Sequence, residues 1–192
     1  MRKVVVFLHQ SLDGIVEGPN GPMDIGWVSY DDQLALHAQE ILSTVDTIVW
    51  GRNTYLVMYA YWPTVPSNPM APKHAVEHAH WVEAVQKVVF STTLEQADWN
   101  NTRLERGNLV EVITELKNQP GNDIMVLGSP RLAHTMMQLG LVDVFKMTIS
   151  PVVLGKGLPY FQSIDSQINL RLTRHQIFPS GVISAVYEKT AK

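Results

Sequence analysis

Two short segments of the chain place a glycine and several polar side chains directly after an apolar strand. The first is Gly51-Arg-Asn-Thr54 and the second is Leu127-Gly-Ser-Pro-Arg131. Each contains one glycine, and the two glycines are 77 residues apart. Each glycine lets a ligand approach the backbone closely, and the following helix offers unpaired N–H groups and the positive end of its dipole. Two such anion-binding turns predict a ligand with more than one phosphate group, and a dinucleotide fits that description.

A second pattern with possible chemistry is His74-Ala-Val-Glu-His78. This order is typical of a class of zinc peptidases, in which two histidines one helical turn apart bind the metal and the glutamate is the base. The sequence offers no clear third ligand, and His80 breaks the face. We therefore favour a histidine-rich helix surface without a metal, and a zinc hydrolase using His74 and His78 stays a remote alternative.

Composition limits the classes of function. The chain has 192 residues, of which 45% are hydrophobic and 17% charged, so we expect a single domain over residues 1–192. A net charge of −3 gives no basic field for nucleic acid, and the lack of cysteine excludes disulfides and cysteine metal ligands. The apolar run Val4–Leu8 is too short for a signal peptide or a membrane span, so we expect a cytoplasmic protein that does not bind membranes.

Strands and helices alternate along most of the chain. Apolar runs predict strands at residues 3–9, 47–50, 87–91 and 123–127. Apolar stripes predict a helix beginning at Asp31 and further helices at residues 74–85, 109–116 and 131–139. Ser129 is expected to cap the last of these helices, with Pro130 at its first position.

The remaining segments are predicted as loops or as antiparallel strands. Residues 14–26 are rich in glycine and indicate a mobile loop, whereas residues 59–72, rich in aromatic residues and proline, indicate an ordered loop. Residues 144–153, 168–178 and 182–189 are long and partly alternating, as expected of antiparallel edge or hairpin strands. The order of elements predicts a three-layer α/β/α domain with a mostly parallel central sheet and an antiparallel C-terminal end.

Seven short segments, in this order, resemble the dihydrofolate reductase-like superfamily, specifically stand-alone relatives of the reductase domain of bacterial riboflavin biosynthesis. The segments are Ser11–Gly14, Gly51–Tyr55, Phe90–Leu94, Trp99–Leu104, Asp123–Ser129, Gly140–Asp143 and Pro151–Gly157. The resemblance covers nearly the whole chain. It implies the α/β/α fold, NADPH as the cofactor and hydride transfer to a small molecule.

The resemblance also implies the contacts of the cofactor. On the two sides of the diphosphate it places Gly51, Arg52, Asn53 and Thr54, and Leu127, Gly128, Ser129, Pro130 and Arg131. It places the adenosine ribose and a 2′-phosphate at Ser91, Thr92 and Thr93. This last segment contains no arginine, so NADPH and NADH both stay open. The backbone of His9 and the side chain of Val16 would contact the nicotinamide.

Two further expectations concern the Gly128–Ser129 peptide bond and the catalytic group. Relatives often carry a glycine at the position of Ser129 and hold the peptide bond before it in the cis form. The sequence leaves open whether the Gly128–Ser129 bond is cis. In dihydrofolate reductases a carboxylate on the helix after the mobile loop orients the substrate. Asp32 is the nearest equivalent here, and Asp31 is the alternative.

The residues and the resemblance together predict an NADPH-dependent reductase of the 5-amino-6-(5-phosphoribosylamino)uracil reductase type, acting on a small heterocyclic or sugar-like molecule. The chain lacks a deaminase domain, and no lysine or arginine cluster marks a ribose-phosphate pocket, so the substrate stays open. A non-catalytic protein that binds a nucleotide or another small ligand is the alternative. We also expect a homodimer, because relatives form one and because residues 144–153 and the last hairpin offer apolar strands that need cover.

Overall fold

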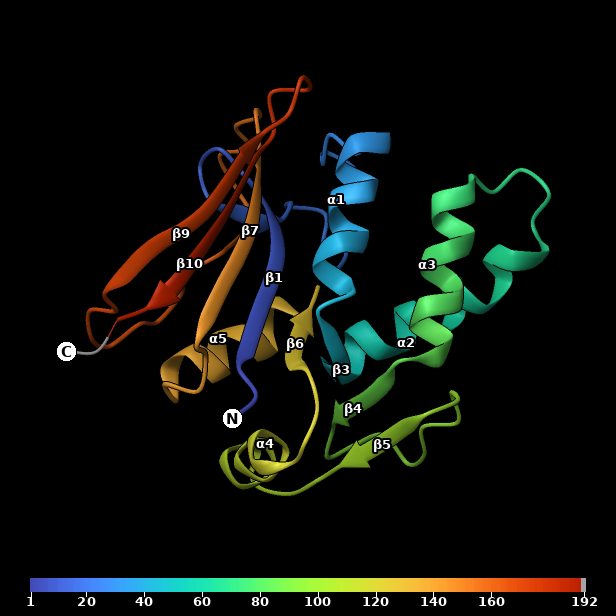
Figure 1. The fold of residues 1–192 in the computed structure, drawn as a ribbon, viewed down its shortest axis with the longest axis vertical. Coiled ribbons are helices and arrows are strands. Elements are labelled where there is room, and N and C mark those ends of the chain that lie inside the picture. The colour runs from blue at the N-terminus through green and yellow to red at the C-terminus, as the bar shows by residue number, and fades with distance from the viewer. Residues whose placement is uncertain (191–192) are drawn as a thin grey trace.

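The computed structural model describes residues 1–190 and contains one eight-stranded sheet with helices on both faces (Figure 1). The strands of this sheet are β1 (Val4–Ser11), β3 (Val45–Gly51), β4 (Gln86–Phe90), β5 (Thr102–Glu105), β6 (Asp123–Leu127), β7 (Val144–Ser150), β9 (Leu170–Ile177) and β10 (Ile183–Lys189). The helices are α1 (Asp32–Leu42), α2 (Arg52–Tyr61), the 3-10 helix η1 (Trp62–Ser67), α3 (Lys73–Ala84), α4 (Leu109–Asn118) and α5 (Pro130–Gln138).

The strand order is β5-β4-β3-β6-β1-β7-β10-β9. The six strands from β5 to β7 in this order are parallel to one another, whereas β10 is antiparallel to both β7 and β9. A second, two-stranded sheet pairs β2 (Ile15–Glu17) with β8 (Leu158–Pro159). The predicted mostly parallel sheet with an antiparallel C-terminal end is therefore confirmed.

The central strands are buried on both faces, which produces two separate cores. Along β1, Val4 and Val6 pack with residues of α4 and α5, whereas Val5 and Phe7 pack with residues of α1, α2 and α3. This alternation follows from the period of two along a strand, and it confirms the three layers. Within residues 1–190 no helix is long and apolar enough to cross a bilayer.

Four parts of the fold differ from the sequence-based prediction. The expected loop at residues 59–72 is largely helical, because α2 extends to Tyr61 and η1 follows it directly. The strand predicted at residues 144–153 ends at Ser150 and is not an edge strand, since β7 lies between β1 and β10. The short strands β2 and β5 were not predicted, because three or four residues carry too little periodicity to be recognised.

Candidate functional site

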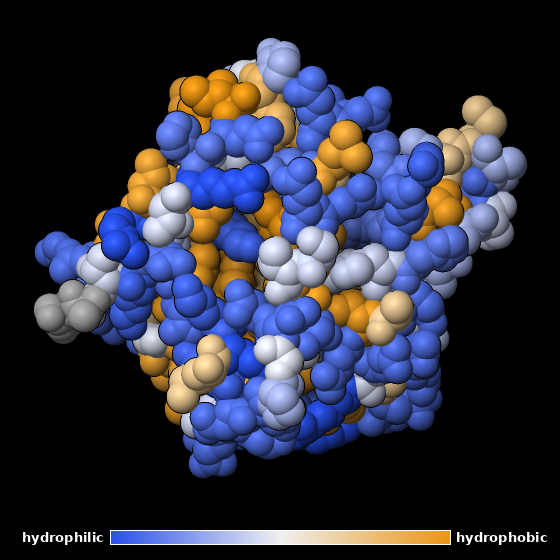
Figure 2. All heavy atoms as spheres, in the orientation of Figure 1, coloured by the Kyte–Doolittle hydropathy of each residue, from blue (hydrophilic) through white to orange (hydrophobic). Residues whose placement is uncertain are grey.

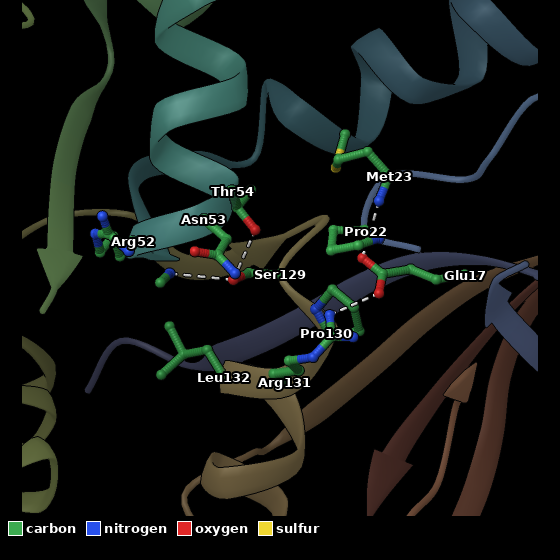
Figure 3. Close-up of a pocket in the computed structure, with 11 residues that line it drawn as sticks. Glu17, Pro22, Met23, Arg52, Asn53, Thr54, Ser129, Pro130, Arg131 and Leu132 are labelled. Atoms are coloured by element: carbon green, nitrogen blue, oxygen red, sulfur yellow. Dashed lines mark hydrogen bonds and ion pairs between the residues drawn. The ribbon is translucent and has the colours of Figure 1, made fainter. Parts of the chain in front are cut away.

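The two glycine turns lie side by side in the structure. Strands β3 and β6 are hydrogen-bonded neighbours, so the turns after them meet at the same sheet edge. The hydroxyl of Ser129 accepts a hydrogen bond from the backbone N–H of Gly51 at 3.1 Å and lies 3.1 Å from the hydroxyl of Thr54 (Figure 3). The two turns are therefore close enough to face one diphosphate, as the prediction of a dinucleotide requires.

Ser129 has a different role from the one predicted for its hydroxyl. The residue occupies the N-cap position of α5 with Pro130 after it, as expected, but its side chain makes no capping hydrogen bond. The hydroxyl turns instead toward Gly51 and Thr54 at the start of α2. Gly128 before it has φ +59°, in the left-handed region that favours glycine, and the Gly128–Ser129 peptide bond is trans.

A cavity of about 240 Å³ opens between the two helix N-termini, and we call it the central cavity. It is lined by Glu17, Pro22, Met23, Gly51, Arg52, Asn53, Thr54, Ser129, Pro130, Arg131 and Leu132. Figure 3 shows Arg52 at one end of this cavity and Glu17 with Arg131 at the other. Both turns predicted to hold a diphosphate therefore face one space, which receives the positive ends of two helix dipoles.

Glu17 is a residue of this site that the sequence analysis did not identify. Its buried carboxylate accepts a hydrogen bond from Arg131 at 2.6 Å and another from the backbone N–H of Met23 at 3.2 Å. The pair ties the glycine-rich loop to α5. No sequence signal marks Glu17, because it lies on the three-residue strand β2 and its partner is 114 residues away.

The segment Pro151–Gly157 supports Glu17 from the other side. A side chain at Gly157 would collide with the backbone of Glu17, because an ideal Cβ would lie 2.2 Å from its carbonyl oxygen. Asp13 attaches the same segment to the end of β1 by accepting hydrogen bonds from the N–H groups of Leu154 and Gly155. These bonds and one from Ser11 lower the pKa of Asp13 to about 2, so Asp13 acts as a turn residue.

A second cavity, of about 380 Å³, adjoins the central cavity at Arg52, and we call it the arginine cavity. It contains the predicted segment Ser91–Thr93 together with two cationic side chains, and its lining is Arg52, Phe90, Ser91, Thr92, Thr93, Glu105, Arg106 and Gly107. Arg106 is held in place by hydrogen bonds to the carbonyls of Leu94 and Glu95. The structure thus supplies the arginines that are absent from the Ser91–Thr93 segment itself.

A third cavity, of about 530 Å³, lies on the opposite side of the central cavity and shares Glu17, Met23 and Pro130 with it. We call it the apolar cavity, because tryptophan, tyrosine, methionine and aliphatic side chains dominate its lining. His9 and Val16, the two residues predicted to contact a nicotinamide, both line it. Leu127, Gly128 and Pro130, which were predicted at the diphosphate, line it as well.

His9 presents a neutral ring to the apolar cavity. Its Nδ1 lies 2.5 Å from the hydroxyl of Thr148 on the neighbouring strand β7, and its ring packs edge-on against Tyr30. Burial lowers the pKa of His9 to about 4, so the ring is uncharged at neutral pH.

Asp32, the predicted catalytic carboxylate, is not brought into any of the three cavities. Its side chain is 94% exposed on the first turn of α1, and its carboxylate lies 3.7 Å from Nδ1 of His74. The alternative, Asp31, is occupied as the N-cap of α1, where it accepts a hydrogen bond from the backbone of Leu34. The assignment of Asp32 as a substrate-orienting group therefore stays a prediction.

The histidines of the zinc alternative both line the apolar cavity. The ring of His78 packs 4.2 Å from that of Trp62, and burial together with the nearby His74 lowers the pKa of His78 to about 4. Glu77 accepts a hydrogen bond from Gln39. Among residues 1–190 no three His, Cys, Asp or Glu side chains are grouped as metal ligands, so this arrangement gives no support to the zinc alternative.

Comparison with known proteins agrees with the geometry. The family model of the RibD C-terminal domain matches residues 2–184. The chain is 36% identical over 186 residues to the uncharacterized protein YyaP of Bacillus subtilis (strain 168), covering 97% of this chain and 94% of that protein.

Solved structures give the fold. The diaminohydroxyphosphoribosylaminopyrimidine deaminase/5-amino-6-(5-phosphoribosylamino)uracil reductase of Thermotoga maritima superposes with a TM-score of 0.67 at 16% identity, over 98% of this chain and 57% of that chain. Dihydrofolate reductase of Enterococcus faecalis, solved with NADP(H), superposes with a TM-score of 0.61 at 13% identity, over 98% and 97% of the two chains. This protein therefore belongs to the RibD C-terminal domain family and has the dihydrofolate reductase-like fold of NADPH-dependent reductases.

Proposed function

We propose that this protein is an NADPH-dependent reductase that transfers hydride to a small heterocyclic or sugar-like molecule. The observation that carries the proposal is the continuity of three cavities with three different chemistries. The central cavity shares Arg52 with the arginine cavity and shares Glu17, Met23 and Pro130 with the apolar cavity. A dinucleotide needs this order of sites, with the phosphate groups in the middle.

The central cavity suits a diphosphate. Two helices begin at it, and their first-turn N–H groups and dipoles attract negative charge. The hydrogen bond between Ser129 and Gly51 holds the two turns together before a ligand arrives, which lowers the ordering cost of binding. The predicted diphosphate contacts from Gly51 to Thr54 and from Ser129 to Arg131 line this cavity, whereas Leu127 and Gly128 line the apolar cavity.

The arginine cavity favours a cofactor that carries an extra phosphate. Arg52 and Arg106 bring two guanidinium groups to the hydroxyl-rich segment Ser91–Thr93, and guanidinium groups bind phosphate through charge-assisted hydrogen bonds. Glu105 also lines the cavity, but its carboxylate is paired with Arg103. We therefore prefer NADPH to NADH, which the segment Ser91–Thr93 alone left open.

The apolar cavity suits a nicotinamide and the substrate beside it. Bound NADPH would supply the hydride, so the protein need only position the reacting groups and exclude water. His9 and Val16 lie in this cavity with Leu127 and Gly128, and its apolar walls exclude water from the reacting carbon.

The proposal is tested by titrating the purified protein with NADPH and with NADH. Trp50 and Trp62 line the apolar cavity, so tryptophan emission reports occupation of the site and energy transfer to a reduced nicotinamide. We expect saturable binding of NADPH, weaker binding of NADH, and oxidation of NADPH at 340 nm once an acceptor is present. Failure of both dinucleotides to bind would contradict the proposal, whereas binding without turnover across a broad panel of acceptors would favour the non-catalytic alternative.

A further inference from the structure

We infer that the substrate of this reductase is a flat, uncharged aromatic or heterocyclic molecule without a phosphate group. The inference rests on the proposed function and narrows it to one substrate class. Its basis is the apolar cavity, which has a volume of about 530 Å³ and which no described lysine or arginine lines.

The walls of the apolar cavity are suited to a ring system. Trp50, Met58 and Trp62 line it on the side of β3 and α2, and Tyr30 stands opposite the rings of His9 and His74 at centroid distances of 6.0 Å and 6.2 Å. Aromatic rings and methionine sulfur bind the faces and edges of flat molecules through apolar contact and quadrupole interactions. A flat ring system would therefore bury most of its surface here.

Glu17, the one carboxylate among the described residues of the cavity wall, would oppose a phosphate. Glu17 is buried at the junction with the central cavity, and its charge is balanced by Arg131 at 2.6 Å. A phosphate dianion brought into the apolar cavity would lose its hydration, meet the carboxylate of Glu17, and gain no cation in return. Arg131 is already engaged by Glu17 and lines the central cavity instead.

The three histidines of the cavity do not replace the missing cation. Burial leaves His9 and His78 uncharged at neutral pH, as described above. The Nδ1 atom of His74 already faces a carboxylate, that of Asp32 at 3.7 Å. The neighbouring Lys73 does not line the cavity, and its side chain is 90% exposed and lies 3.4 Å from Glu77.

The arginine cavity, proposed above for the extra phosphate of the cofactor, offers a comparison within the same chain. The arginine cavity combines Arg52 and Arg106 with the hydroxyls of Ser91, Thr92 and Thr93. The contrast between the two ends of one continuous site indicates that the cationic groups serve the cofactor. The substrate end is left to apolar and uncharged polar contacts.

The test uses the NADPH complex of the full chain and a matched pair of probes, 5-amino-6-(ribosylamino)uracil and its 5′-phosphate, together with a set of neutral bicyclic heterocycles. NADPH binding is measured first, so that its failure contradicts the proposed function and not the substrate class. Quenching of tryptophan emission and oxidation of NADPH then report each probe. We expect the neutral probe to bind at least about tenfold more tightly than its phosphate. A ratio of this size in the dissociation constants corresponds to burying one charge without a partner.

Equal or tighter binding of the phosphorylated probe would overturn the inference, and so would a failure of every neutral ring compound to bind the NADPH complex.

A cation added to the wall of the apolar cavity supplies a second test. Tyr61→Arg, at the end of α2 in the lining, should raise affinity for the phosphorylated probe about tenfold, whereas Leu56→Arg, exposed on the same helix and outside the lining, should not. Ala75→Lys, on the α3 wall, repeats the test if Tyr61→Arg fails to fold. If both Tyr61→Arg and Ala75→Lys bind NADPH but keep the preference for the neutral probe, the lack of a cation in the wall does not explain that preference.

Discussion

The hydroxyl oxygen of Ser129 lies 3.1 Å from the backbone nitrogen of Gly51, although the two residues are 78 positions apart. This contact joins the two turns that border the central cavity, and the hydroxyl of Thr54 completes it at 3.1 Å. The site is therefore preorganised by a hydrogen bond between its two halves, and the neighbouring residues can be tested one by one.

Ser129→Ala should weaken both the fold and the cofactor site. The change removes the partner of the part-buried Gly51 N–H and of the buried Thr54 hydroxyl, which costs about 1–3 kcal/mol of unfolding free energy. Urea unfolding and NADPH titration measure the two effects. Ser67→Ala is the control, because it removes an exposed hydroxyl that donates to the carbonyl of Thr64 in its own helical turn, and it should change neither stability nor NADPH affinity. An unaltered NADPH affinity in Ser129→Ala would contradict the role given to the contact of Ser129 with Gly51 and Thr54.

Arg106→Gln should separate NADPH from NADH. Loss of one guanidinium from the arginine cavity is expected to weaken NADPH binding about tenfold to a hundredfold, the range for a charge-assisted hydrogen bond, while NADH binding changes little. The ratio of the two dissociation constants is the measurement. Arg171→Gln on the edge strand β9 is the control, and an equal loss for both dinucleotides would argue against a 2′-phosphate at Arg106.

Gly128→Ala and Gly155→Ala form a matched pair at positive φ. Both residues are left-handed, at +59° and +72°, so each alanine should lower the unfolding free energy by about 1–2 kcal/mol. Only Gly128 lines a cavity, so only Gly128→Ala should also lower NADPH affinity. Equal NADPH affinities in the two variants would place the cofactor elsewhere.

Acid should destabilise the protein through His9 and His78. Each has a pKa near 4 in the folded state, below its ordinary value of 6.5, so between these pH values the unfolded chain binds more protons. The stability that these groups contribute is fully present above pH 6.5 and is lost as the pH falls toward 4.

Urea unfolding at pH 7.5, 5.5 and 4.5 measures how the unfolding free energy changes with pH. Carboxylates titrate in the same range, so histidine variants are needed to separate the two contributions. His78→Phe keeps a ring against Trp62 and removes the titrating group, so its stability should fall less steeply between pH 6.5 and 4. His80→Gln alters an exposed histidine and should keep the slope of the parent protein. Parallel slopes in all three proteins would contradict the assignment.

The expected homodimer would use the C-terminal hairpin. Strand β7 is covered by β1 and β10, so the uncovered strand is β9, whose exposed edge includes Leu172 and Ile177. Light scattering should give twice the chain mass, and Leu172→Lys should lower that mass at a given concentration. Val57→Lys, an exposed change on α2, should not, and a monomer at all concentrations would contradict the expectation.

The sequence by itself determined the features that depend on neighbouring residues. Strands followed by a glycine and a helix, the alternation of β and α elements, and the positions of Ser129 and Pro130 at the start of α5 all follow from local periodicity and turn chemistry. The resemblance carried by the seven segments then led to the family. These signals are local, and so they can be read without a structure.

Only the tertiary structure decided which distant groups share a cavity. The direction of the Ser129 hydroxyl, the pairing of Glu17 with Arg131, and the approach of Arg106 to Ser91–Thr93 depend on strand order and on the short strands β2 and β5. The helical form of η1 was likewise found only in the fold, where Trp62 packs its ring against His78 of α3. Contacts between residues far apart in the chain leave no periodic mark in the sequence, and this is the physical reason why they had to be found in the fold.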